Sequence, residues 1–323
     1  MKNTTVLAGI ATILFSGSAL ANDAEEYGII PLPSTVEINH DKAKLGKKLF
    51  NDPLLSVDGT ISCASCHDLA KGGTDQTAVS IGVGGQKGPI NSPTIYNSEH
   101  NFVQFWDGRA NNLAEQALGP VENPKEMGEN WTNVINKLNN NEEYKAAFGL
   151  VYGGAITKEN AADAIAEFER TLITPDSPFD KYLRGDKNAI SAQALKGYEL
   201  FKDKGCVSCH DGPYLGGASY QAMSEDYFID RGNITEADFG RFNVTKDEYD
   251  KYTFKVPMLR NIAVTAPYFH DGQVKTLQQA VSIMAKYQLG EELSDSEAKS
   301  ITEFLESLTG QYKGVSLDKI EAE

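Results

Sequence analysis

The chain has 323 residues, which is long enough for two domains of ordinary size. Its formal net charge of −15 argues against binding to nucleic acid or to anionic membranes. The same acidity fits either ordinary solubility or electrostatic attraction of a basic partner protein. Beyond Ala21, no stretch approaches the ~20 consecutive apolar residues that a transmembrane helix needs, so no membrane span is predicted.

The N-terminus has the pattern of a secretory signal peptide. Met1 and Lys2 give a positively charged start, residues 6–15 are mostly apolar, and Ala19-Leu20-Ala21 is a small-residue cleavage site. The apolar core is too short for a membrane span. We therefore predict a signal peptide over residues 1–21 and a mature chain that begins near Asn22.

The first chemical motif follows a predicted helix. Gly46-Lys47-Lys48-Leu49-Phe50 ends a helical pattern whose apolar residues share one face, and Cys63-Ala64-Ser65-Cys66-His67 comes soon after it. The pattern C-x-x-C-H attaches haem c covalently: the thiols of Cys63 and Cys66 add to the vinyl groups, and His67 reaches the iron.

The same arrangement occurs a second time. Gly197-Tyr198-Glu199-Leu200-Phe201 precedes Cys206-Val207-Ser208-Cys209-His210, and the two motifs use all four cysteines of the chain. A thioredoxin-like redox site is one alternative, but it does not require a His after the second Cys. A zinc site shared by both cysteine pairs is another, but it would need the pairs to lie close together, and they are far apart in the sequence. We therefore predict two haem c groups, held by Cys63, Cys66, Cys206 and Cys209. Because haem c is attached outside the bacterial cytoplasm, a periplasmic location is predicted.

A second pair of helices repeats downstream of the motifs. Residues 165–172 match residues 301–308, both with apolar side chains at i, i+3 and i+7, and Ser294 to Glu297 forms a plausible N-terminal cap for the later helix. Each half thus reads helix, haem motif, loop-rich stretch and amphipathic helix. Glycine-rich stretches at Gly72-Gly73 and residues 82–88 indicate loops that wrap a cofactor closely.

The predicted fold is mainly α, with two class I cytochrome c-like domains that each surround one covalently attached haem c and carry long ordered loops. Thr174-Pro175-Asp176-Ser177-Pro178 is a turn-rich linker between the halves. The expected division is 22–175 for an N-terminal haem domain and 176–323 for a C-terminal haem domain. The C-terminal tail is expected to pack on the first domain.

Further segments distributed along the mature chain carry a family resemblance. They are Leu49 to Ser56, Asn91-Ser92-Pro93-Thr94, Gln104 to Ala110, Glu115-Gln116-Ala117, Gly119-Pro120 with Glu126-Met127, Leu259-Arg260-Asn261, and Thr265-Ala266-Pro267-Tyr268-Phe269-His270. With the two haem motifs, they resemble the bacterial di-haem cytochrome c peroxidases. The resemblance implies a peroxidatic N-terminal haem and a high-potential C-terminal haem at which electrons enter.

The resemblance also implies iron ligands. His67 and His210 match the proximal ligands, and Met284 matches the second ligand of the C-terminal haem. Met284 also precedes the last predicted helix, as the methionine loop does in class I cytochromes c, and thioether ligation raises the potential of haem iron. Met223 and Met258 are rival ligands, and methionine is most often a core residue.

Catalytic roles follow from the same resemblance. Glu126 and Gln116 match the distal pair at the peroxidatic haem, where a carboxylate moves a proton between the peroxide oxygens and an amide orients the peroxide. Trp106 matches an aromatic residue between the haems that assists electron transfer. One calcium ion is implied between the domains, bound by the Asn91 side chain and the backbone carbonyls of Thr265 and Pro267.

One departure from the family is evident. The usual Ser-x-Gly-His pattern after the first motif, whose His caps the peroxidatic iron in the oxidised enzyme, reads Ser80-Ile81-Gly82-Val83 here. Val83 cannot bind iron, so the distal ligand and the need for reductive activation stay open. His100 is either a substitute ligand or an exposed loop residue.

These observations predict a periplasmic cytochrome c peroxidase that reduces hydrogen peroxide to water. The expected electron donor is a small soluble redox protein, either a monohaem cytochrome c or a cupredoxin. Two alternatives are a di-haem electron carrier and an oxidase of a protein substrate related to the enzymes that mature methylamine dehydrogenase; the latter place a Tyr at the position of Met284. The donor's identity, the reduction potentials and the oligomeric state, a homodimer included, are left open by the sequence.

Overall fold

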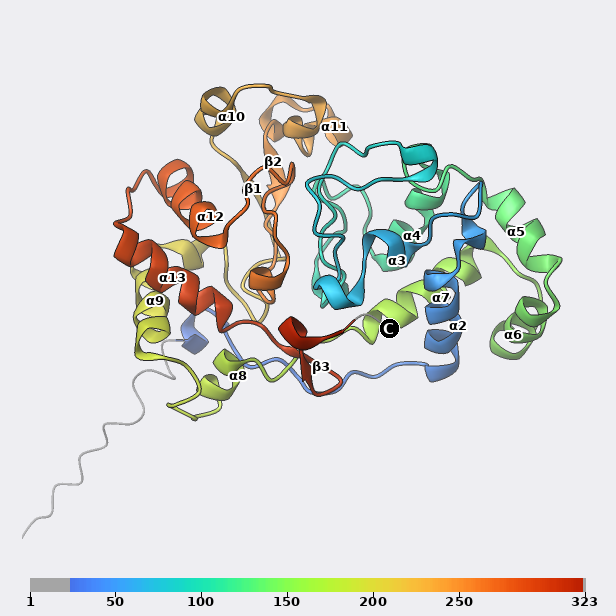
Figure 1. Cartoon of the computed structure of the whole chain (residues 1–323), viewed down its shortest axis with the longest axis horizontal. Helices are drawn as coiled ribbons and strands as arrows, with labels where there is room; N and C mark the ends of the chain where they lie inside the picture. Colours follow the sequence, from blue (N-terminus) through green and yellow to red (C-terminus); the bar gives the residue numbers. More distant parts are fainter. Residues whose placement is uncertain (1–23, 322–323) are drawn as a thin grey trace, which may run out of the picture.

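The computed structural model describes residues 24–321, and helices dominate it (Figure 1). The predicted signal peptide of residues 1–21 lies outside the described residues. Helices of the first half are α2 (His40–Asn51), α3 (Cys63–Cys66), α4 (Leu113–Glu122), α5 (Trp131–Asn139), α6 (Glu142–Tyr152) and α7 (Lys158–Arg170). Those of the second half are α8 (Pro178–Leu183), α9 (Ala192–Asp203), α10 (Glu225–Arg231), α11 (Phe242–Thr245), α12 (Leu277–Met284) and α13 (Asp295–Glu306).

Strands are short, in agreement with the mainly α prediction. β1 (Tyr220–Ala222) pairs antiparallel with β2 (Thr253–Lys255), with Tyr220 opposite Lys255. β3 (Gln311–Tyr312) pairs antiparallel with β4 (Val315–Ser316). The mainly α prediction is therefore confirmed. Within residues 24–321, none of the helices has the length and apolar character that crossing a membrane requires.

Two matching helix crossings organise the structure. Helix α2 packs against α7, and α9 packs against α13. At both crossings a glycine lets the backbones meet: a Cβ atom on Gly46 would lie 1.8 Å from the Ala164 carbonyl oxygen, and one on Gly197 would lie 1.9 Å from that of Ser300. The repeated helices predicted from the sequence are thus confirmed, and their shared glycine has the same packing role in each half.

Helix ends follow capping chemistry. α13 begins with a capping box in which Ser294 and Glu297 exchange hydrogen bonds, as the sequence indicated. It begins earlier than the repeat over residues 301–308 and ends at Glu306. Similarly, α7 starts after the Thr157 cap and ends at Arg170, before the predicted end at Leu172.

Two hydrophobic clusters lie beneath these crossings, and each also contains residues from one end of the described chain. One contains Leu49, Phe50 and Phe168, and the other contains Tyr198, Phe201 and Phe304. The first cluster also contains Leu317 of the C-terminal tail. The second contains Ala24 and Ile29 of the N-terminal segment. Each chain end therefore packs on the half that is remote from it in sequence.

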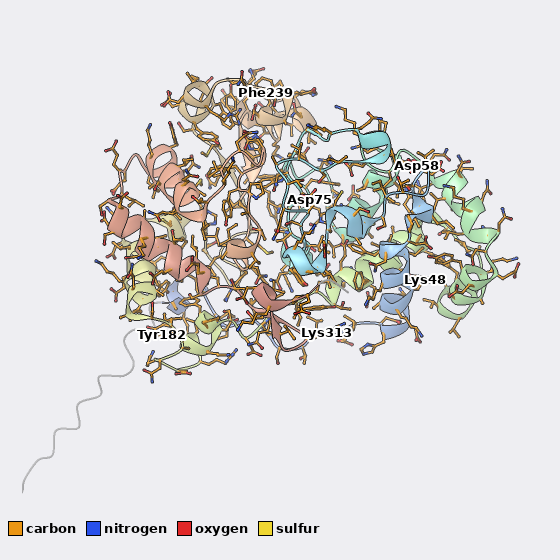
Figure 2. All side chains as sticks on the ribbon, viewed as in Figure 1. Lys48, Asp58, Asp75, Tyr182, Phe239 and Lys313 are labelled. Carbon is orange, nitrogen blue, oxygen red and sulfur yellow. The ribbon has the colours of Figure 1, made fainter. Side chains whose placement is uncertain are left out.

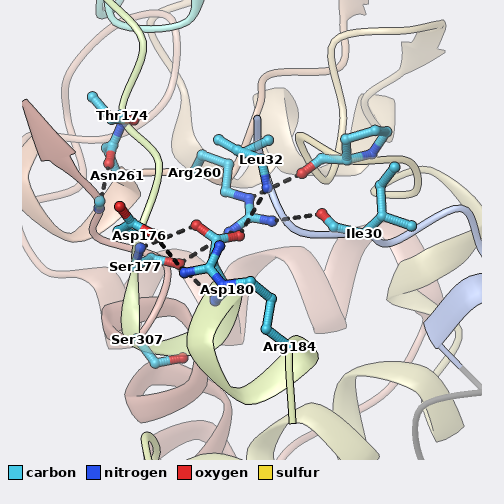
Figure 3. A network of polar contacts seen from close by, with 12 residues as sticks. Ile30, Leu32, Thr174, Asp176, Ser177, Asp180, Arg184, Arg260, Asn261 and Ser307 are labelled. Carbon is cyan, nitrogen blue, oxygen red and sulfur yellow. Dashed lines mark hydrogen bonds and ion pairs between the residues drawn. The ribbon is translucent and has the colours of Figure 1, made fainter. Parts of the chain in front are cut away.

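The segment joining the halves is held by a buried polar network (Figure 3). Arg260 forms an ion pair with Asp180 at 2.8 Å, and both side chains are almost fully buried. The Arg260 guanidinium also donates to the carbonyl oxygens of Pro213 and Ile30. Asn261 donates to Thr174 at 2.8 Å. The predicted linker is therefore fixed to both the N-terminal segment and the second half.

Loops of residues 68–100 form the side of the first half that faces the second. Figure 2 shows Asp75 among these loops, and side chains fill the space between the two halves. The Asp75 carboxylate accepts hydrogen bonds from the Thr77 amide and the Ser80 hydroxyl. These bonds close the turns that follow the first cysteine motif.

Candidate functional site

His67 is held in an orientation that suits an iron ligand. It follows the short helix α3, and its amide donates to the Cys63 carbonyl at 3.0 Å. Its Nδ1 lies 3.2 Å from the Gly73 carbonyl oxygen. Because a carbonyl only accepts hydrogen bonds, Nδ1 carries the hydrogen and Nε2 keeps the lone pair, 3.5 Å from the Ser92 hydroxyl. Burial lowers the pKa of His67, which favours the neutral form that binds metal.

The second motif repeats this geometry. The His210 amide donates to the Cys206 carbonyl at 3.0 Å, and Nδ1 of His210 lies 3.2 Å from the Leu215 carbonyl oxygen. Burial lowers the pKa of His210 as well. Both motifs therefore present a neutral imidazole with Nε2 available, next to two free thiols. This donor set fits a haem c at each motif.

A cavity of about 280 Å³ lies at the second motif, and its wall is mostly apolar. Cys206, Cys209 and His210 line it, as do Met223, Met258 and Met284. Met284 ends α12 and is followed directly by a π-helical turn, η9 (Ala285–Leu289), a distortion often found at functional sites. The structure thus brings the expected ligand Met284 to the same cavity as His210, together with both rivals.

Trp106 connects this cavity to the first half. It lines the cavity, and its indole N–H donates to the Asn91 carbonyl at 2.9 Å. Its ring contacts His270 edge to face, at 6.4 Å between centroids. Phe254 and Phe228 of the second half lie in the hydrophobic cluster that packs against it. The indole is therefore fixed between the two halves.

His270 belongs to a buried charged cluster. Its Nε2 lies 2.7 Å from an Asp238 carboxylate oxygen, and Arg231 pairs with both Asp238 and Asp271. The geometry of these two carboxylates and the imidazole could hold a metal ion. The guanidinium already supplies the positive charge, so the cluster acts as an ion-pair network that fixes the Phe269-His270 turn.

Glu126 lies in the loop that follows α4. Its carboxylate accepts a hydrogen bond from the Asn123 amide at 2.6 Å. Burial raises the pKa of Glu126, while the Asn123 bond and the Arg109 charge oppose that rise. The Glu126 charge also raises the pKa of both Cys63 and Cys66, to which burial contributes more. Glu126 is therefore within electrostatic reach of the first haem motif.

Gln116 lies on α4, beside the segment that carries Glu126. The Met127 amide donates to the Pro120 carbonyl and the Glu129 amide to the Val121 carbonyl, so the loop folds back along the end of α4. Gln116 is half-buried on this helix. The two residues of the predicted distal pair thus belong to one local unit.

The loop carrying Val83 is packed directly on this unit. The Val83 amide donates to the Glu126 carbonyl at 2.8 Å, and the Val83 side chain is buried. A Cβ atom on Gly82 would lie 2.1 Å from the Lys125 carbonyl oxygen, so only glycine permits this approach. His100 is exposed and stacks on Tyr214 at 4.3 Å, beside the second motif. The exposed-residue interpretation of His100 is the one that the structure supports.

The predicted calcium ligands lie on adjoining segments. The Asn91 amide nitrogen donates to the Thr77 carbonyl at 2.8 Å, which leaves its Oδ1 available to a cation. Neighbours of Thr77, namely Gln76 and Ala78, line a second cavity together with Ala266 and Pro267. The backbone N–H of Asn91 donates to the backbone carbonyl of His270 at 2.7 Å. Asn91 Oδ1 is thus an oxygen of the kind that calcium prefers, on a segment next to the one that carries Thr265 and Pro267.

Two buried ionisable residues that lie near the haem motifs were not singled out from the sequence. Glu169 in α7 is 5% exposed, and burial raises its pKa to about 8. Its charge contributes to the raised pKa of Cys63, so it lies near the first motif. A carboxylate on the apolar stripe of residues 165–172 was the available signal. Lys255 is 8% exposed on the wall of the second-motif cavity. A lysine between Phe254 and Val256 gave little indication of that placement.

Comparison with known proteins agrees with this geometry. The profile of the di-haem cytochrome c peroxidase family matches residues 40–188. Cytochrome c peroxidase Ccp of Escherichia coli (strain K12) is 52% identical over 306 residues, which cover 94% of this chain and 66% of that protein. Cytochrome c551 peroxidase of Nitrosomonas europaea is 49% identical over 290 residues, 90% of this chain and 86% of that protein. The chain belongs to the di-haem cytochrome c peroxidase family.

Solved structures of similar proteins share the fold of this chain. A crystal structure of a MauG-like protein associated with microbial copper homeostasis superposes with a TM-score of 0.77 at 27% identity. The match covers 88% of this chain and 94% of that one. Since the chain spans 66% of the length of the Escherichia coli relative, just under two thirds, that protein has additional sequence.

Proposed function

We propose that this di-haem peroxidase family member reduces hydrogen peroxide to water in the periplasm, using electrons from a small soluble donor. The observation that carries the proposal is the pair of C-x-x-C-H motifs with matching His geometry, in a chain closely related to cytochrome c peroxidases. A monohaem cytochrome c or a cupredoxin fits the donor role, and the net charge of −15 favours a basic one.

The protein would hold its two haem c groups through Cys63 and Cys66 in the first half and Cys206 and Cys209 in the second. When bound, the haems supply the electron transfer and the redox chemistry of O–O cleavage. His67 and His210 would hold the irons through Nε2, and the carbonyls that accept from Nδ1 fix the rings. Met284 would serve as the second protein ligand of the C-terminal haem, where a thioether favours a high potential.

Glu126 is proposed as the proton carrier at the first haem. Burial raises its pKa, which brings the carboxyl group closer to the range in which it both accepts and returns a proton. It would take a proton from one peroxide oxygen and deliver it to the other. Gln116 would orient the peroxide by hydrogen bonding, and Arg109 adds a positive charge nearby.

Trp106 and calcium would hold the halves in register for electron transfer. The indole is fixed through Asn91 and His270, between the second-motif cavity and the first half. Asn91 and the carbonyls of Thr265 and Pro267 would hold the proposed calcium ion, which would reinforce the same contact. The boundary at residues 175 and 176 is proposed to separate a peroxidatic domain from an electron-entry domain.

Met284 also bears on the alternative of a protein-substrate oxidase. The resemblance places a Tyr at this position in enzymes that mature methylamine dehydrogenase, and this chain has a methionine whose side chain reaches the haem cavity. A pure electron carrier would have no use for a half-buried carboxylate such as Glu126 at the first motif.

The test uses periplasmically matured protein. Mass spectrometry of the denatured chain should show two covalent haems. Peroxide consumption should depend on a reduced cytochrome c or cupredoxin and oxidise two donors per peroxide. A single haem mass, or an absence of peroxide turnover in the two-haem protein, contradicts the proposal.

A further inference from the structure

Lys255 is a buried cation on the wall of the second-motif cavity. It ends β2, is 8% exposed and is flanked by the apolar residues Phe254 and Val256. Its ammonium donates a hydrogen bond to Asn101 Oδ1 at 3.0 Å. Its backbone N–H donates to the Trp106 carbonyl at 2.9 Å. The side chain is thus fixed where the second half meets the first.

Within residues 24–321, no carboxylate forms an ion pair with Lys255. Burial alone lowers the pKa of Lys255 to about 8, with no opposing charge among the causes. Other basic residues of the cavity wall differ: Lys204 pairs with Glu291, and His270 pairs with Asp238. One neutral hydrogen bond compensates only part of the cost of removing an ammonium from water, so an anion within reach of Lys255 would stabilise its charged form.

The cavity indicates where that anion comes from. Cys206, Cys209 and His210 line it with Lys255, and the rest of its wall is mostly apolar. Haem carries two propionate carboxylates on an otherwise apolar ring. We propose that Lys255 binds a propionate of the haem at the second motif, with Asn101 orienting the ammonium. This inference rests on the proposed function, because it assumes a haem at Cys206 and Cys209.

The contact has a consequence for redox chemistry. A positive charge that neutralises the propionate disfavours the ferric form, so Lys255 raises the potential of the electron-entry haem. It also joins that haem to the Trp106 backbone and to Asn101, which both belong to the first half. Lys255 is a positioning residue that couples haem potential to the contact between the halves.

The experiment compares the midpoint potential of the second haem in K255M, K255R and K204M with that of the unmodified protein. K204M is the matched control, because Lys204 lines the same cavity but already has Glu291 as its partner. At the midpoint potential of the unmodified protein, K255M should lower the ferrous-to-ferric ratio of the second haem about tenfold. This corresponds to a midpoint potential lower by about 59 mV for a one-electron couple. The difference in midpoint potential between K255M and the unmodified protein should shrink at lower pH, because the unpaired propionate takes up a proton.

Rescue separates an ionic role from simple packing. K255R should restore the potential and K204M should leave it unchanged. Equal potentials for K255M and the unmodified protein at every pH, with two haems retained, overturn the inference. If K255M does not accumulate, the midpoint potential of the second haem is measured against pH in the unmodified protein. A propionate paired with Lys255 predicts a potential nearly independent of pH from about 5 to 7. A slope of about 59 mV per pH unit contradicts the inference. Absence of a haem at Cys206 and Cys209 in the unmodified protein would instead contradict the proposed function.

Discussion

At Glu126, burial and hydrogen bonding act on one carboxyl group in opposite directions. Burial raises its pKa, and the Asn123 amide and Arg109 counteract that rise. The balance leaves a group whose proton affinity is above that of a solvated glutamate but not locked in either form. A proton carrier at a haem needs this property, because it must gain and lose the same proton in one turnover.

Replacing this carboxyl group tests the role directly. Glu126→Gln keeps the side-chain shape and should reduce turnover by about 100-fold or more, with haem content unchanged. Turnover of the unmodified enzyme should fall as pH drops through the raised pKa of Glu126, since the base form is then lost. Steady-state peroxide assays across pH measure both. Glu122→Gln, at the exposed end of α4, is the control, and near-normal turnover in Glu126→Gln rules out the role.

Three methionines line the second-motif cavity, so ligand identity is also decided at the residue scale. Met284→His should leave both haems attached and lower the potential of the second haem markedly, because imidazole is a stronger donor to ferric iron than thioether. Potentiometric titration followed by visible spectroscopy measures the shift. Met258→His is the matched comparison. A shift in that variant, with Met284→His unchanged, would assign the ligand to Met258.

At the scale of elements, two helix crossings and one loop carry the most information. Gly46 and Gly197 occupy equivalent places in the repeated helices, and each touches a carbonyl of the partner helix. The loop of residues 82–88 rests on the Glu126 segment through Gly82 and Val83. Both features depend on close backbone approach, which any larger side chain would prevent.

Gly46→Ala should therefore destabilise the folded protein. The new methyl group would meet the Ala164 carbonyl at 1.8 Å, so α2 and α7 must separate. A cost of about 1–3 kcal/mol in the free energy of unfolding is expected, as for overpacked cores. Gly149→Ala in α6 is the control: nothing lies near its Cβ position, and the change should stabilise by up to about 1 kcal/mol. Chemical denaturation distinguishes them, and equal effects of both substitutions would contradict the packing argument.

Val83 leads to a prediction about activation. Without a histidine on this loop, no ligand bond has to break before peroxide reaches the first haem. The fully oxidised enzyme should then hold a partly high-spin first haem and react with peroxide without prior reduction. Rapid mixing, followed in the Soret region, measures this. His100→Ala is the control for a substitute ligand. A low-spin bis-histidine spectrum, with no reaction until one electron is added, would show that a lock persists.

On the scale of the whole molecule, the halves are joined by exchanged chain ends and by the Arg260 network. Ile29 packs in the second hydrophobic cluster and Leu317 packs in the first. Arg260 binds Asp180 and the carbonyls of Ile30 and Pro213, so the N-terminal segment, the linker and the second half meet at one guanidinium (Figure 3). These contacts fix the spacing between the two halves.

Arg260→Ala should consequently be far more damaging than a surface change. It leaves the Asp180 carboxylate buried without its partner, which costs about 3–5 kcal/mol of unfolding free energy. Arg184→Ala removes a half-exposed pair with Asp176 and should cost about 0–1 kcal/mol. Denaturant titration of the two-haem protein compares them. Similar small losses in both variants would show that Arg260 is not essential to the assembly.

Local chemistry explains what could be predicted from the sequence alone. The C-x-x-C-H motifs, the helical repeats with their glycines and the Ser294 cap are encoded within a few residues, because spacing and periodicity are properties of the backbone itself. The family resemblance then supplied Glu126, Gln116, Trp106 and Met284 as candidates. Their environments did not follow from it, because burial and pKa depend on distant segments.

Only the tertiary structure decided which remote groups meet. It set Trp106 against His270, rested Val83 on Glu126, exchanged the chain ends between the two clusters, and buried Lys255 on the wall of the second-motif cavity. Each of these contacts joins residues far apart in the chain. Desolvation, which raises the pKa of Glu126 and lowers that of Lys255, is a property of the packed interior and has no local signature.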